Sequence, residues 1–267
     1  MTTEELHTHL TEFTFNDLSD SYLKRKTELE YFEVEGFRIP RFVNEFWTSK
    51  QRQNNPIHEV SYRACFKAEL PRFFIKLLTK ENDVVYDPFA GRGTSILEAA
   101  LLNRNIIAND INPLSTILSK PRLYIPSCEE VEERLKKIKF RNVLKADIDL
   151  SMFYHSETES EIVSLRNYLI RKKKDEEEDF IDDWIRMVAT NRLTGHSKNF
   201  FSVYTLPPNQ AVTQERQKRI NMQRKQRPAY KDVKFIIMKK SRDLTSGINK
   251  KLIDRLKRIN SKTGSLF

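Results

Sequence analysis

One short segment of the chain constrains its fold more than any other. An apolar run at residues 83–86 leads into a turn that contains Gly91 and Gly93, and residues 95–102 follow with the pattern of an amphipathic helix. A strand, a tight glycine turn and a helix in this order are typical of the ligand-binding corner of a parallel α/β sheet. Glycine has no Cβ atom, so it lets the backbone bend sharply and approach a ligand closely. We therefore predict a buried strand at 83–86, a helix at 95–102 and a binding site at the turn between them.

The residues around the two glycines exclude two common nucleotide sites. A dinucleotide fingerprint requires a third glycine shortly after Gly93, where this chain has Ser95 and Ile96. A phosphate-binding loop ends in Gly-Lys-Ser or Gly-Lys-Thr, and the residue after Gly93 is Thr94. The turn is therefore expected to bind a ligand of another kind.

A second predicted strand adds a carboxylate beside this turn. Residues 105–110 form a strand-like run that ends in Asp110, 23 positions after Asp87. A carboxylate at the end of the second strand is well placed to accept hydrogen bonds from the hydroxyl groups of a ribose. Asn112 and Pro113 then break the strand, and proline is favoured in the first turn of a helix.

These residues resemble a known family. Residues 87–94 and 109–114 resemble the cofactor motif of S-adenosylmethionine-dependent DNA methyltransferases that modify exocyclic amino groups, and residues 57–71 resemble the segment that precedes the first strand in that family. The resemblance covers roughly residues 57–120, and a weaker likeness extends to about residue 245. It implies S-adenosylmethionine as the cofactor. It also implies an α/β fold, with a partial doubly wound, Rossmann-like methyltransferase sheet and a mostly helical recognition region.

The resemblance further implies which side chains hold the cofactor. Tyr62 and Phe66 are the aromatic side chains of the preceding segment, and Asp110 is the acceptor for the ribose. The predicted cofactor-binding residues are Tyr62, Arg63, Ala64, Phe66, Asp87, Pro88, Phe89, Ala90, Gly91, Gly93, Thr94, Asp110 and Ile111. No metal is expected.

The charge of the chain indicates an acidic partner. The 267 residues carry 47 Lys and Arg against 37 Asp and Glu, a formal net charge of +10. Residues 215–262 hold seventeen basic and four acidic side chains, so the rest of the chain is slightly acidic. Such a basic block attracts phosphate backbones whatever their sequence, although a solvated tail has the same composition. Because the cofactor motif points separately to a nucleic-acid substrate, we predict double-stranded DNA as a partner.

The sequence favours a cytoplasmic location. Cys65 and Cys128 are the only cysteines, too few for a disulfide framework or a cysteine metal site. No apolar stretch approaches the roughly twenty residues of a membrane helix, and the acidic N-terminus lacks the pattern of a signal peptide. We expect a nucleoid-associated protein of a prokaryotic restriction–modification system, without a membrane partner.

The chain divides into four predicted segments. Residues 1–56 form an N-terminal extension, and residues 57–126 form the S-adenosylmethionine-binding part of the methyltransferase domain. Residues 127–233 form a mostly helical target-recognition region, and residues 234–267 form a basic segment that leads to the catalytic half of the domain. Within this last segment, residues 234–244 are predicted to form a strand and a turn.

Helical spacing of apolar residues predicts further helices. They lie at residues 70–79, 128–139, 159–171 and 180–191. Ser127 is predicted to cap the second of them, which has glutamates in its first turn. The residues expected to be buried in the last are Phe180, Ile181, Trp184 and Val188.

A polar turn is predicted to contact the DNA target. Residues 195–204 combine small hydrogen-bonding side chains with aromatic ones, and His196 is expected to be a turn residue rather than a catalytic one. Asn, Gln, Arg, Lys, Ser and Thr are the side chains that recognise base edges. The predicted DNA-binding residues are Lys198, Asn199, Asn209, Gln210, Arg216 and Arg219.

The sequence lacks a second motif that amino methylation requires. The lone pair of a base amino group is delocalised into the ring, so hydrogen-bond acceptors must polarise that group while the base is flipped out of the duplex. In the resembled family these acceptors belong to Asp, Asn or Ser followed by Pro-Pro and an aromatic residue. The only Pro-Pro here lies in Leu206-Pro207-Pro208-Asn209, where an apolar residue and an amide occupy the two functional positions. No catalytic residue is therefore predicted in this chain.

The missing motif leads to the hypothesis of a split enzyme. In relatives with this order of motifs, the cofactor motif comes first, a long recognition region follows, and the catalytic motif comes last. The sequence ends at Phe267, about where the catalytic strand is expected. We expect this chain to be the cofactor-binding subunit of a DNA amino-methyltransferase, active with a second subunit that carries the catalytic motif. An incomplete sheet has an open edge that needs a partner.

Two alternatives and two choices stay open. The chain is alternatively part of an RNA N2-guanine methyltransferase, which has a similar glycine motif, or a truncated remnant that only binds DNA. The target sequence and the choice between adenine N6 and cytosine N4 are not readable from these residues.

Overall fold

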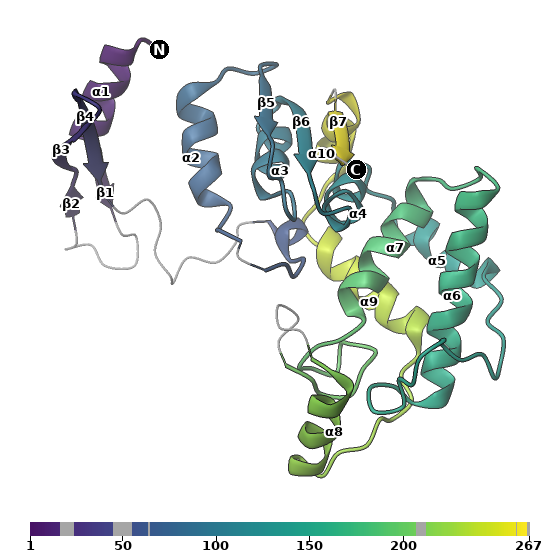
Figure 1. Ribbon diagram of the computed structural model, residues 1–267. Helices are drawn as coiled ribbons and strands as arrows, with labels where there is room; N and C mark the ends of the chain where they lie inside the picture. Colours follow the sequence, from purple (N-terminus) through teal and green to yellow (C-terminus); the bar gives the residue numbers. More distant parts are fainter. Residues whose placement is uncertain (17–23, 45–54, 64, 207–211, 260, 266–267) are drawn as a thin grey trace.

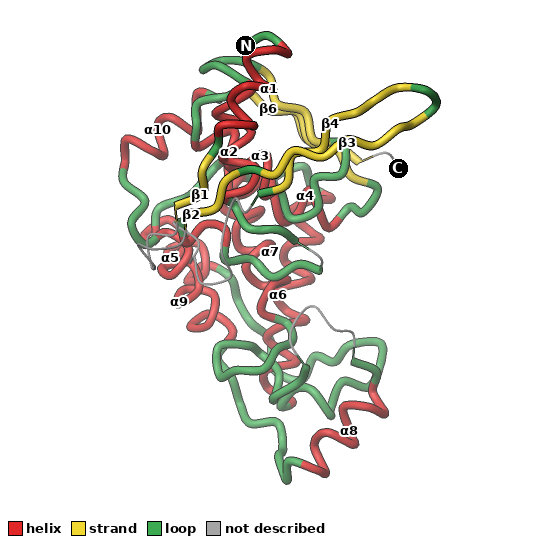
Figure 2. The backbone as a smooth tube through the Cα atoms, turned by 90° about the vertical axis from the view of Figure 1, so that its left-hand side faces the viewer, coloured by secondary structure: helices red, strands yellow, loops and turns green. Residues whose placement is uncertain are grey.

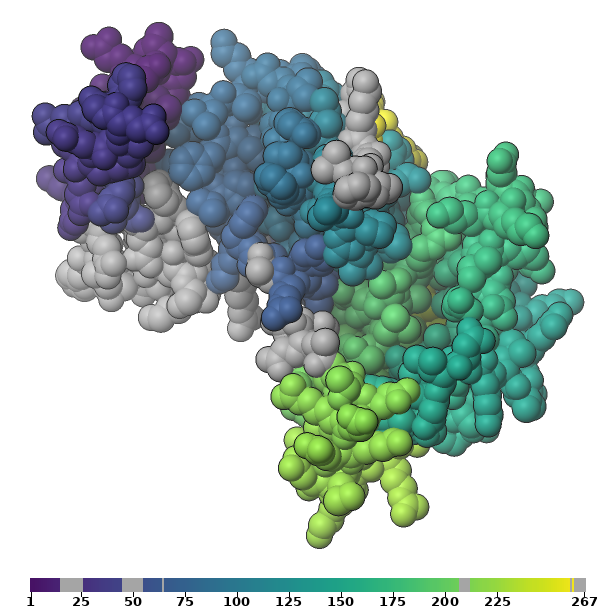
Figure 3. Space-filling view, in the orientation of Figure 1, coloured from purple at the N-terminus to yellow at the C-terminus, as the bar shows by residue number. Residues whose placement is uncertain are grey.

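The computed structural model describes residues 1–16, 24–44, 55–63, 65–206, 212–259 and 261–265. Figure 1 shows a small N-terminal part, a sheet with helices beside it, and a mainly helical part that ends in α8. Figure 3 shows that the N-terminal part and α8 lie at separate ends of the molecule. The α/β class is thereby confirmed, and the doubly wound sheet stays a prediction.

A parallel three-stranded sheet carries the glycine turn. Its strands are β5 (Val84–Asp87), β6 (Asn105–Asp110) and β7 (Ser261–Ser265), in the order β5-β6-β7. Both pairings are parallel. The helix α3 (Thr94–Leu101) connects the first two strands. The predicted strand–turn–helix and the strand ending in Asp110 are confirmed.

The strand β7 was not predicted. It follows the last helix and pairs with β6 in the register Ile107↔Lys262. Its sequence, Ser-Lys-Thr-Gly-Ser, has none of the apolar alternation by which a strand is recognised. The sheet therefore contains a strand from outside the predicted 57–126 segment.

The prediction that residues 83–86 are buried is wrong for one face of the strand. Val84 is 57% exposed and Tyr86 is 59% exposed. On β6, Ile106 is 1% exposed whereas Ile107 is 38% exposed. The helix α3 covers only one face of the sheet, and among the described residues β5 has a strand partner on one side only.

Helices build the rest of the body. They are α4 (Leu114–Ser119), the 3₁₀ turn η2 (Lys120–Leu123), α5 (Cys128–Lys137), α6 (Ser156–Lys174), α7 (Phe180–Arg192), α8 (Gln214–Gln223), α9 (Val233–Thr245) and α10 (Lys250–Arg258). Trp184 and Ile237, from α7 and α9, are fully buried in their shared core. Ser127 caps α5 as predicted, accepting a hydrogen bond from Glu130 N at 3.1 Å. Phe180 is 39% exposed, so its predicted burial is wrong; it lies in the first turn of α7.

The strand predicted at residues 234–244 is also wrong, because these residues form α9. Asp232 caps this helix by accepting a hydrogen bond from Phe235 N at 2.9 Å. Its buried residues recur at helical rather than alternating spacing, for example Ile237, Ser241 and Leu244. A continuous apolar run does not by itself distinguish a buried strand from a helix.

The N-terminal part packs on the sheet domain through aromatic side chains. It contains α1 (Thr3–Glu12), β1 (Thr14–Asn16), β2 (Lys24–Lys26), β3 (Glu28–Val34) and β4 (Phe37–Val43), and it is followed by the 3₁₀ turn η1 (Pro56–His58) and α2 (Glu69–Leu78). The rings of Phe13 and Phe73 meet edge to face at 5.0 Å. Strands β3 and β4 form a two-stranded ribbon (Figure 2).

Candidate functional site

The turn after β5 has the sharp geometry that its glycines predict. Gly91 has a φ of 52° and Gly93 a φ of 80°, the left-handed region that glycine adopts without strain. A Cβ atom on Gly93 would lie 2.7 Å from the Cβ atom of Ser119, so any larger residue would have to displace its surroundings. The Asp87 carboxylate accepts a hydrogen bond from Phe89 N at 3.0 Å and shapes the entry to the turn.

The Asp110 carboxylate joins this turn to the end of the neighbouring strand. Its Oδ2 accepts a hydrogen bond from Gly91 N at 2.7 Å, and its Oδ1 accepts one from Asn112 N at 2.8 Å. The side chain is nearly buried, with the residue 9% exposed. Each carboxylate oxygen has a further lone pair, so Asp110 can still accept hydrogen bonds from a ligand.

The aromatic ring of Tyr62 lies beside the turn. A Cβ atom on Gly91 would lie 3.2 Å from the Cε1 atom of Tyr62, so the ring rests against the glycine backbone. The Tyr62 hydroxyl accepts a hydrogen bond of 3.4 Å from Asn112 Nδ2. Tyr62 therefore contacts both strand ends that a ligand in this corner would touch.

A buried arginine that the sequence analysis overlooked holds this aromatic segment in place. Arg92, between the two glycines, is 7% exposed and donates hydrogen bonds to the carbonyl oxygens of His58, Val60 and Phe66 at 3.3, 3.0 and 3.3 Å. Its Nε donates to Thr94 Oγ1 at 3.1 Å. Burial lowers the pKa of Arg92, although the guanidinium stays charged at neutral pH. The turn thus holds the main chain at residues 58, 60 and 66.

Arg122 supports the same segment from behind the turn. It is fully buried and donates to the carbonyl oxygens of Leu118 at 2.8 Å, Ile57 at 3.1 Å and Arg92. Burial, with a smaller effect of the Arg92 charge, lowers the pKa of Arg122 to about 9. Long-range contacts of this kind leave no local pattern in a sequence.

The helix α3 contributes a carboxylate to this network. Glu98 Oε1 lies 2.7 Å from Nε2 of His58, and its Oε2 accepts a hydrogen bond from Arg72 Nη1 at 2.9 Å. His58 is fully buried, and desolvation lowers its pKa although Glu98 opposes the change. A neutral imidazole that donates from Nε2 fits this geometry.

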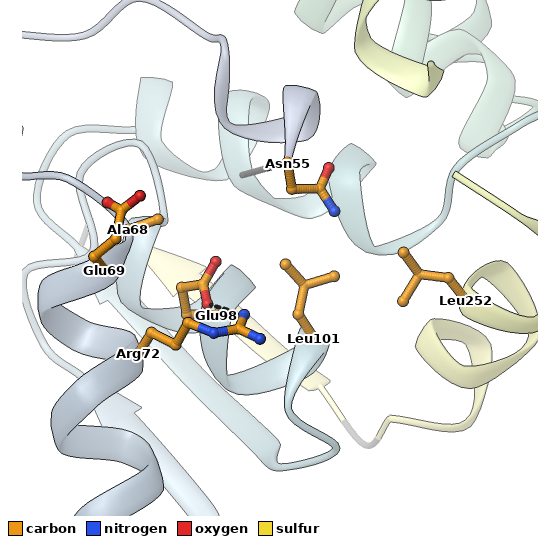
Figure 4. Close-up of a pocket in the computed structure, with 7 residues that line it drawn as sticks. All are labelled: Asn55, Ala68, Glu69, Arg72, Glu98, Leu101 and Leu252. Atoms are coloured by element: carbon orange, nitrogen blue, oxygen red, sulfur yellow. Dashed lines mark hydrogen bonds and ion pairs between the residues drawn. The ribbon is translucent and has the colours of Figure 1, made fainter. Parts of the chain in front are cut away.

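A cavity of about 260 Å³ adjoins the Arg72–Glu98 pair (Figure 4). Side chains of α2, α3 and α10 line it, including Glu69, Leu101 and Leu252. None of the residues of the glycine turn lines it. It is therefore separate from the corner formed by Tyr62, Gly91 and Asp110.

The structure brings most of the predicted cofactor residues together at the ends of β5 and β6. Phe89 and Ile111 project there and are 83% and 63% exposed. Phe66 is 44% exposed and joins the corner through its carbonyl group. Arg63 is exposed, and Ala64 lies outside the described residues.

Four of the six predicted DNA-binding residues lie in exposed positions of the helical part. Lys198 and Asn199 are in the loop after α7, where Asn199 Oδ1 accepts a hydrogen bond from Lys239 Nζ at 2.9 Å. Arg216 and Arg219 are exposed on α8. Asn209 and Gln210 lie outside the described residues.

Side-chain amides tie α8 to the polar loop that precedes it. Gln217 and Gln226 each donate a hydrogen bond to the carbonyl oxygen of Tyr204 at 2.9 Å. The guanidinium of Arg224 stacks 3.8 Å from the centre of the Tyr204 ring. The loop and α8 therefore form one surface that carries basic side chains.

Within the described ranges, no group of three or more His, Cys, Asp or Glu side chains is arranged to hold a metal ion. The part of the chain that the structure describes also has no helix long and apolar enough to cross a membrane.

A comparison with known proteins finds a family match that covers the glycine turn and its surroundings. Residues 16–118 match the sequence model of a family described as DNA methylase. The matched range contains the whole corner from Tyr62 to Asp110. The resemblance to DNA amino-methyltransferases is confirmed by this match and by the relatives below.

Three curated proteins share parts of the sequence. The type II methyltransferase M.BsoBI of Geobacillus stearothermophilus is 28% identical over 130 residues, 47% of this chain and 25% of that protein. The type II methyltransferase M.MjaII of Methanocaldococcus jannaschii is 27% identical over 101 residues, 38% of this chain and 18% of that protein. The type II methyltransferase M.HindIII of Haemophilus influenzae is 49% identical over 43 residues, 16% of this chain and 14% of that protein.

The matched segments span a quarter or less of the length of these relatives. No solved structure matches the chain.

Proposed function

We propose that this chain binds S-adenosylmethionine at the corner between β5 and β6, and that the methyl group is transferred to an exocyclic amino group of DNA. The observation that carries the proposal is the joined pair of strand ends, where Asp110 accepts a hydrogen bond from Gly91 N and Tyr62 rests on Gly91. The setting is a type II restriction–modification system, as the names of the relatives suggest.

The residues of the corner fit the proposed cofactor. The Asp110 carboxylate is preoriented at a strand end, where it would accept hydrogen bonds from the ribose hydroxyls. Tyr62 and the exposed Phe89 would pack against the adenine ring, and Gly91 and Gly93 leave room for close approach of the ligand. When bound, S-adenosylmethionine supplies an electrophilic methyl group on sulfur. The chain's own part is to bind and orient this donor.

The acceptor side of the reaction is proposed to belong to a second polypeptide. The only Pro-Pro of the sequence has Leu206 before it and Asn209 after it, so it offers neither the polar nor the aromatic side chain that the base amino group needs. Among the described residues, β5 has a free edge. Val84 and Tyr86 expose apolar surface next to that edge. Exposed strand edges and apolar faces are surfaces on which proteins pair.

DNA contacts are proposed for the helical part. The loop that contains Lys198 and Asn199 and the helix that contains Arg216 and Arg219 are exposed and joined through Tyr204. Basic side chains bind the phosphate backbone, and amide side chains can recognise base edges. We propose that this surface, within residues 127–233, recognises the target.

Reconstituted methyl transfer tests the proposal. The purified chain is incubated with S-adenosylmethionine labelled in the methyl group and duplex DNA, alone and with a polypeptide that carries a Ser/Asp/Asn-Pro-Pro-aromatic motif from the same locus. We expect labelled N6-methyladenine or N4-methylcytosine only when both polypeptides are present. Full activity of the chain alone would contradict the division of labour. Cofactor binding without methylation under any pairing would favour a DNA-binding remnant.

A further inference from the structure

A second cavity lies between α6 and the segment that follows α5, and it is strongly basic. Its volume is about 540 Å³. Its lining includes the cations Lys137, Lys139, Arg141 and Arg171, together with the amide of Asn167, and no Asp or Glu. We call it the α5–α6 cavity. It uses none of the residues of the glycine turn, and α6 lies at the side of the molecule away from the sheet (Figure 1).

The walls of this cavity are held by buried polar side chains. Ser160 Oγ donates a hydrogen bond to the carbonyl oxygen of Arg141 at 2.6 Å, and Ser164 Oγ accepts one from Arg141 N at 3.0 Å. Glu159 Oε1 accepts a hydrogen bond from Ala146 N at 2.9 Å. Ser160, Ser164 and Glu159 are all buried on α6. The segment after α5 is therefore fixed against α6, and the cavity exists before any ligand arrives.

The lining of the cavity contains no carboxylate that would neutralise these positive charges, although Glu177 interacts with Arg171 from outside the lining. In the described part of the chain, none of the four lining cations forms an ion pair within 4.0 Å of a carboxylate. The buried carboxylate of Asp182 is nearby but already engaged. It pairs with Arg134 at 2.6 Å and accepts a hydrogen bond from the Tyr168 hydroxyl at 3.0 Å. Four like charges around one cavity attract an anion.

The chemistry of the lining favours phosphate groups as that anion. Lysine and arginine donate charge-assisted hydrogen bonds to phosphate oxygens, and arginine can bind two oxygens of one group. Lys137 is the last residue of α5, Lys139 and Arg141 lie in the loop that follows it, and Arg171 lies on α6. Such a spread suits successive phosphates along a backbone.

We propose that the α5–α6 cavity binds backbone phosphates of the DNA duplex, as an anchoring site apart from the cofactor corner. This rests on the proposed function for the choice of DNA. Phosphate contacts fix the position of a protein on the duplex but carry no sequence information directly. The cavity would therefore fix the position of the protein on the DNA. The bases would be contacted at another place, by the loop that contains Asn199.

Duplex binding by the full chain tests this site. Fluorescence anisotropy with a labelled duplex is measured over a range of salt concentrations for the wild type and for Lys139→Gln/Arg141→Gln. The matched control is Lys76→Gln/Lys80→Gln, which removes two exposed cations at the end of α2 that do not line the cavity. If two phosphate contacts are lost, the slope of log affinity against log salt falls by about 2, and the affinity falls roughly tenfold or more in dilute salt. The control variant is expected to bind like the wild type.

Three outcomes would contradict the proposal. Unchanged affinity and slope in Lys139→Gln/Arg141→Gln, with normal S-adenosylmethionine binding, would contradict the DNA site and leave the proposed function intact. A wild-type chain that binds no duplex would also contradict it. Pyrophosphate binding that the double variant abolishes, without any effect on duplex binding, would show a site for free phosphates and overturn the DNA assignment.

A charge-retaining variant guards against misfolding. Lys139→Arg/Arg141→Lys keeps both charges and is expected to restore duplex affinity and salt slope. If it binds DNA as weakly as the Gln variant while keeping the wild-type melting temperature, the loss does not come from charge and the proposal is wrong.

Discussion

The main-chain N–H of Gly91 donates a hydrogen bond to Oδ2 of Asp110 across 2.7 Å, and this contact ties the turn after β5 to the end of β6. The same carboxylate receives Asn112 N through its other oxygen. Two strand ends that are 23 residues apart in sequence are thus locked into one corner before any ligand binds. Preorganisation of this kind lowers the free-energy cost of ordering a site on binding.

Replacing Gly93 tests the tight packing of the corner. Gly93→Ala is expected to lower the free energy of unfolding by about 2–4 kcal/mol, because alanine must adopt a positive φ and its Cβ atom would lie 2.7 Å from that of Ser119. Gly247→Ala is the matched control, since Gly247 has a φ of 78° but no atom within 4 Å of the added Cβ. Urea denaturation of both variants separates the backbone strain from the clash. Equal losses in the two variants would show that the packing against Ser119 is unimportant.

Removing the Arg92 side chain tests whether its hydrogen bonds hold the segment before α2 in place. Arg92→Met leaves the carbonyl groups of His58 and Val60 without their buried donor, at a cost of about 1–3 kcal/mol for each group. We expect faster amide hydrogen exchange in residues 57–66 and weaker S-adenosylmethionine binding, because Tyr62 loses its support. Arg92→Lys should restore part of both.

The control for this prediction is another buried arginine with the same kind of bonding. Arg104 is 7% exposed and donates to the carbonyl oxygens of Thr79 and Leu102, both at 2.6 Å, away from the glycine turn. Arg104→Met should destabilise the chain without changing cofactor affinity at a temperature where it is folded. Unchanged amide hydrogen exchange in residues 57–66 of Arg92→Met would show that Arg92 does not hold this segment in place.

The buried His58 predicts a dependence of stability on pH. Desolvation, opposed by Glu98 and assisted by the charges of Arg122 and Arg92, lowers its pKa below the ordinary value of 6.5. Well above pH 6.5 His58 is neutral in the folded and unfolded chains and contributes no dependence of stability on pH. Below pH 6.5 the unfolded chain binds a proton that the folded chain resists, so the free energy of unfolding falls as the pH decreases.

Melting temperatures measured between about pH 5 and pH 8 check this sign. His58→Gln keeps an N–H donor for Glu98 and should lose the part of the acid destabilisation that belongs to His58. His196→Gln, at an exposed turn position, is the control and should follow the wild type. A wild-type slope that survives in His58→Gln would assign the pH dependence to other groups.

The free edge of β5 predicts a docking surface for the second polypeptide. Val84 is 57% exposed at the start of the strand, so Val84→Lys should change the melting temperature of the isolated chain by only a few degrees. S-adenosylmethionine binding should be retained, since Val84 lies at the opposite end of β5 from the turn. Methyl transfer in the reconstituted mixture should fall, because a buried lysine disrupts strand pairing. Equal methylation by Val84→Lys and the wild type would place the partner elsewhere.

Local patterns predicted the corner, and long-range contacts escaped prediction. Each element of the corner is determined by a pattern of consecutive residues. The strand–turn–helix around Gly91 and the strand ending in Asp110 could therefore be predicted from the sequence. The role of Arg92 depends on carbonyl groups that lie 26–34 positions away in sequence. The strand β7 has a polar sequence that becomes a strand only by pairing with β6. Tertiary context decides such elements.

At residues 234–244 the apolar run led to the prediction of a strand, whereas the structure has the helix α9. Its length and composition suit a buried strand, but Asp232 caps a helix there and Trp184 Nε1 donates a hydrogen bond to Ser241 Oγ at 3.0 Å from the facing helix. The exposure of Val84 and Tyr86 was missed for a related reason, because burial depends on what covers the sheet.

Calorimetric titration of S-adenosylmethionine into the purified chain tests the central claim most directly. Asp110→Asn is compared with Asp175→Asn, which makes the same replacement at an exposed position just after α6. We predict saturable binding to the wild type and to Asp175→Asn, and an affinity at least roughly tenfold lower for Asp110→Asn, since a charge-assisted hydrogen bond contributes about 1.5–3 kcal/mol. Absence of binding to the wild type, or equal binding by Asp110→Asn, would contradict the account.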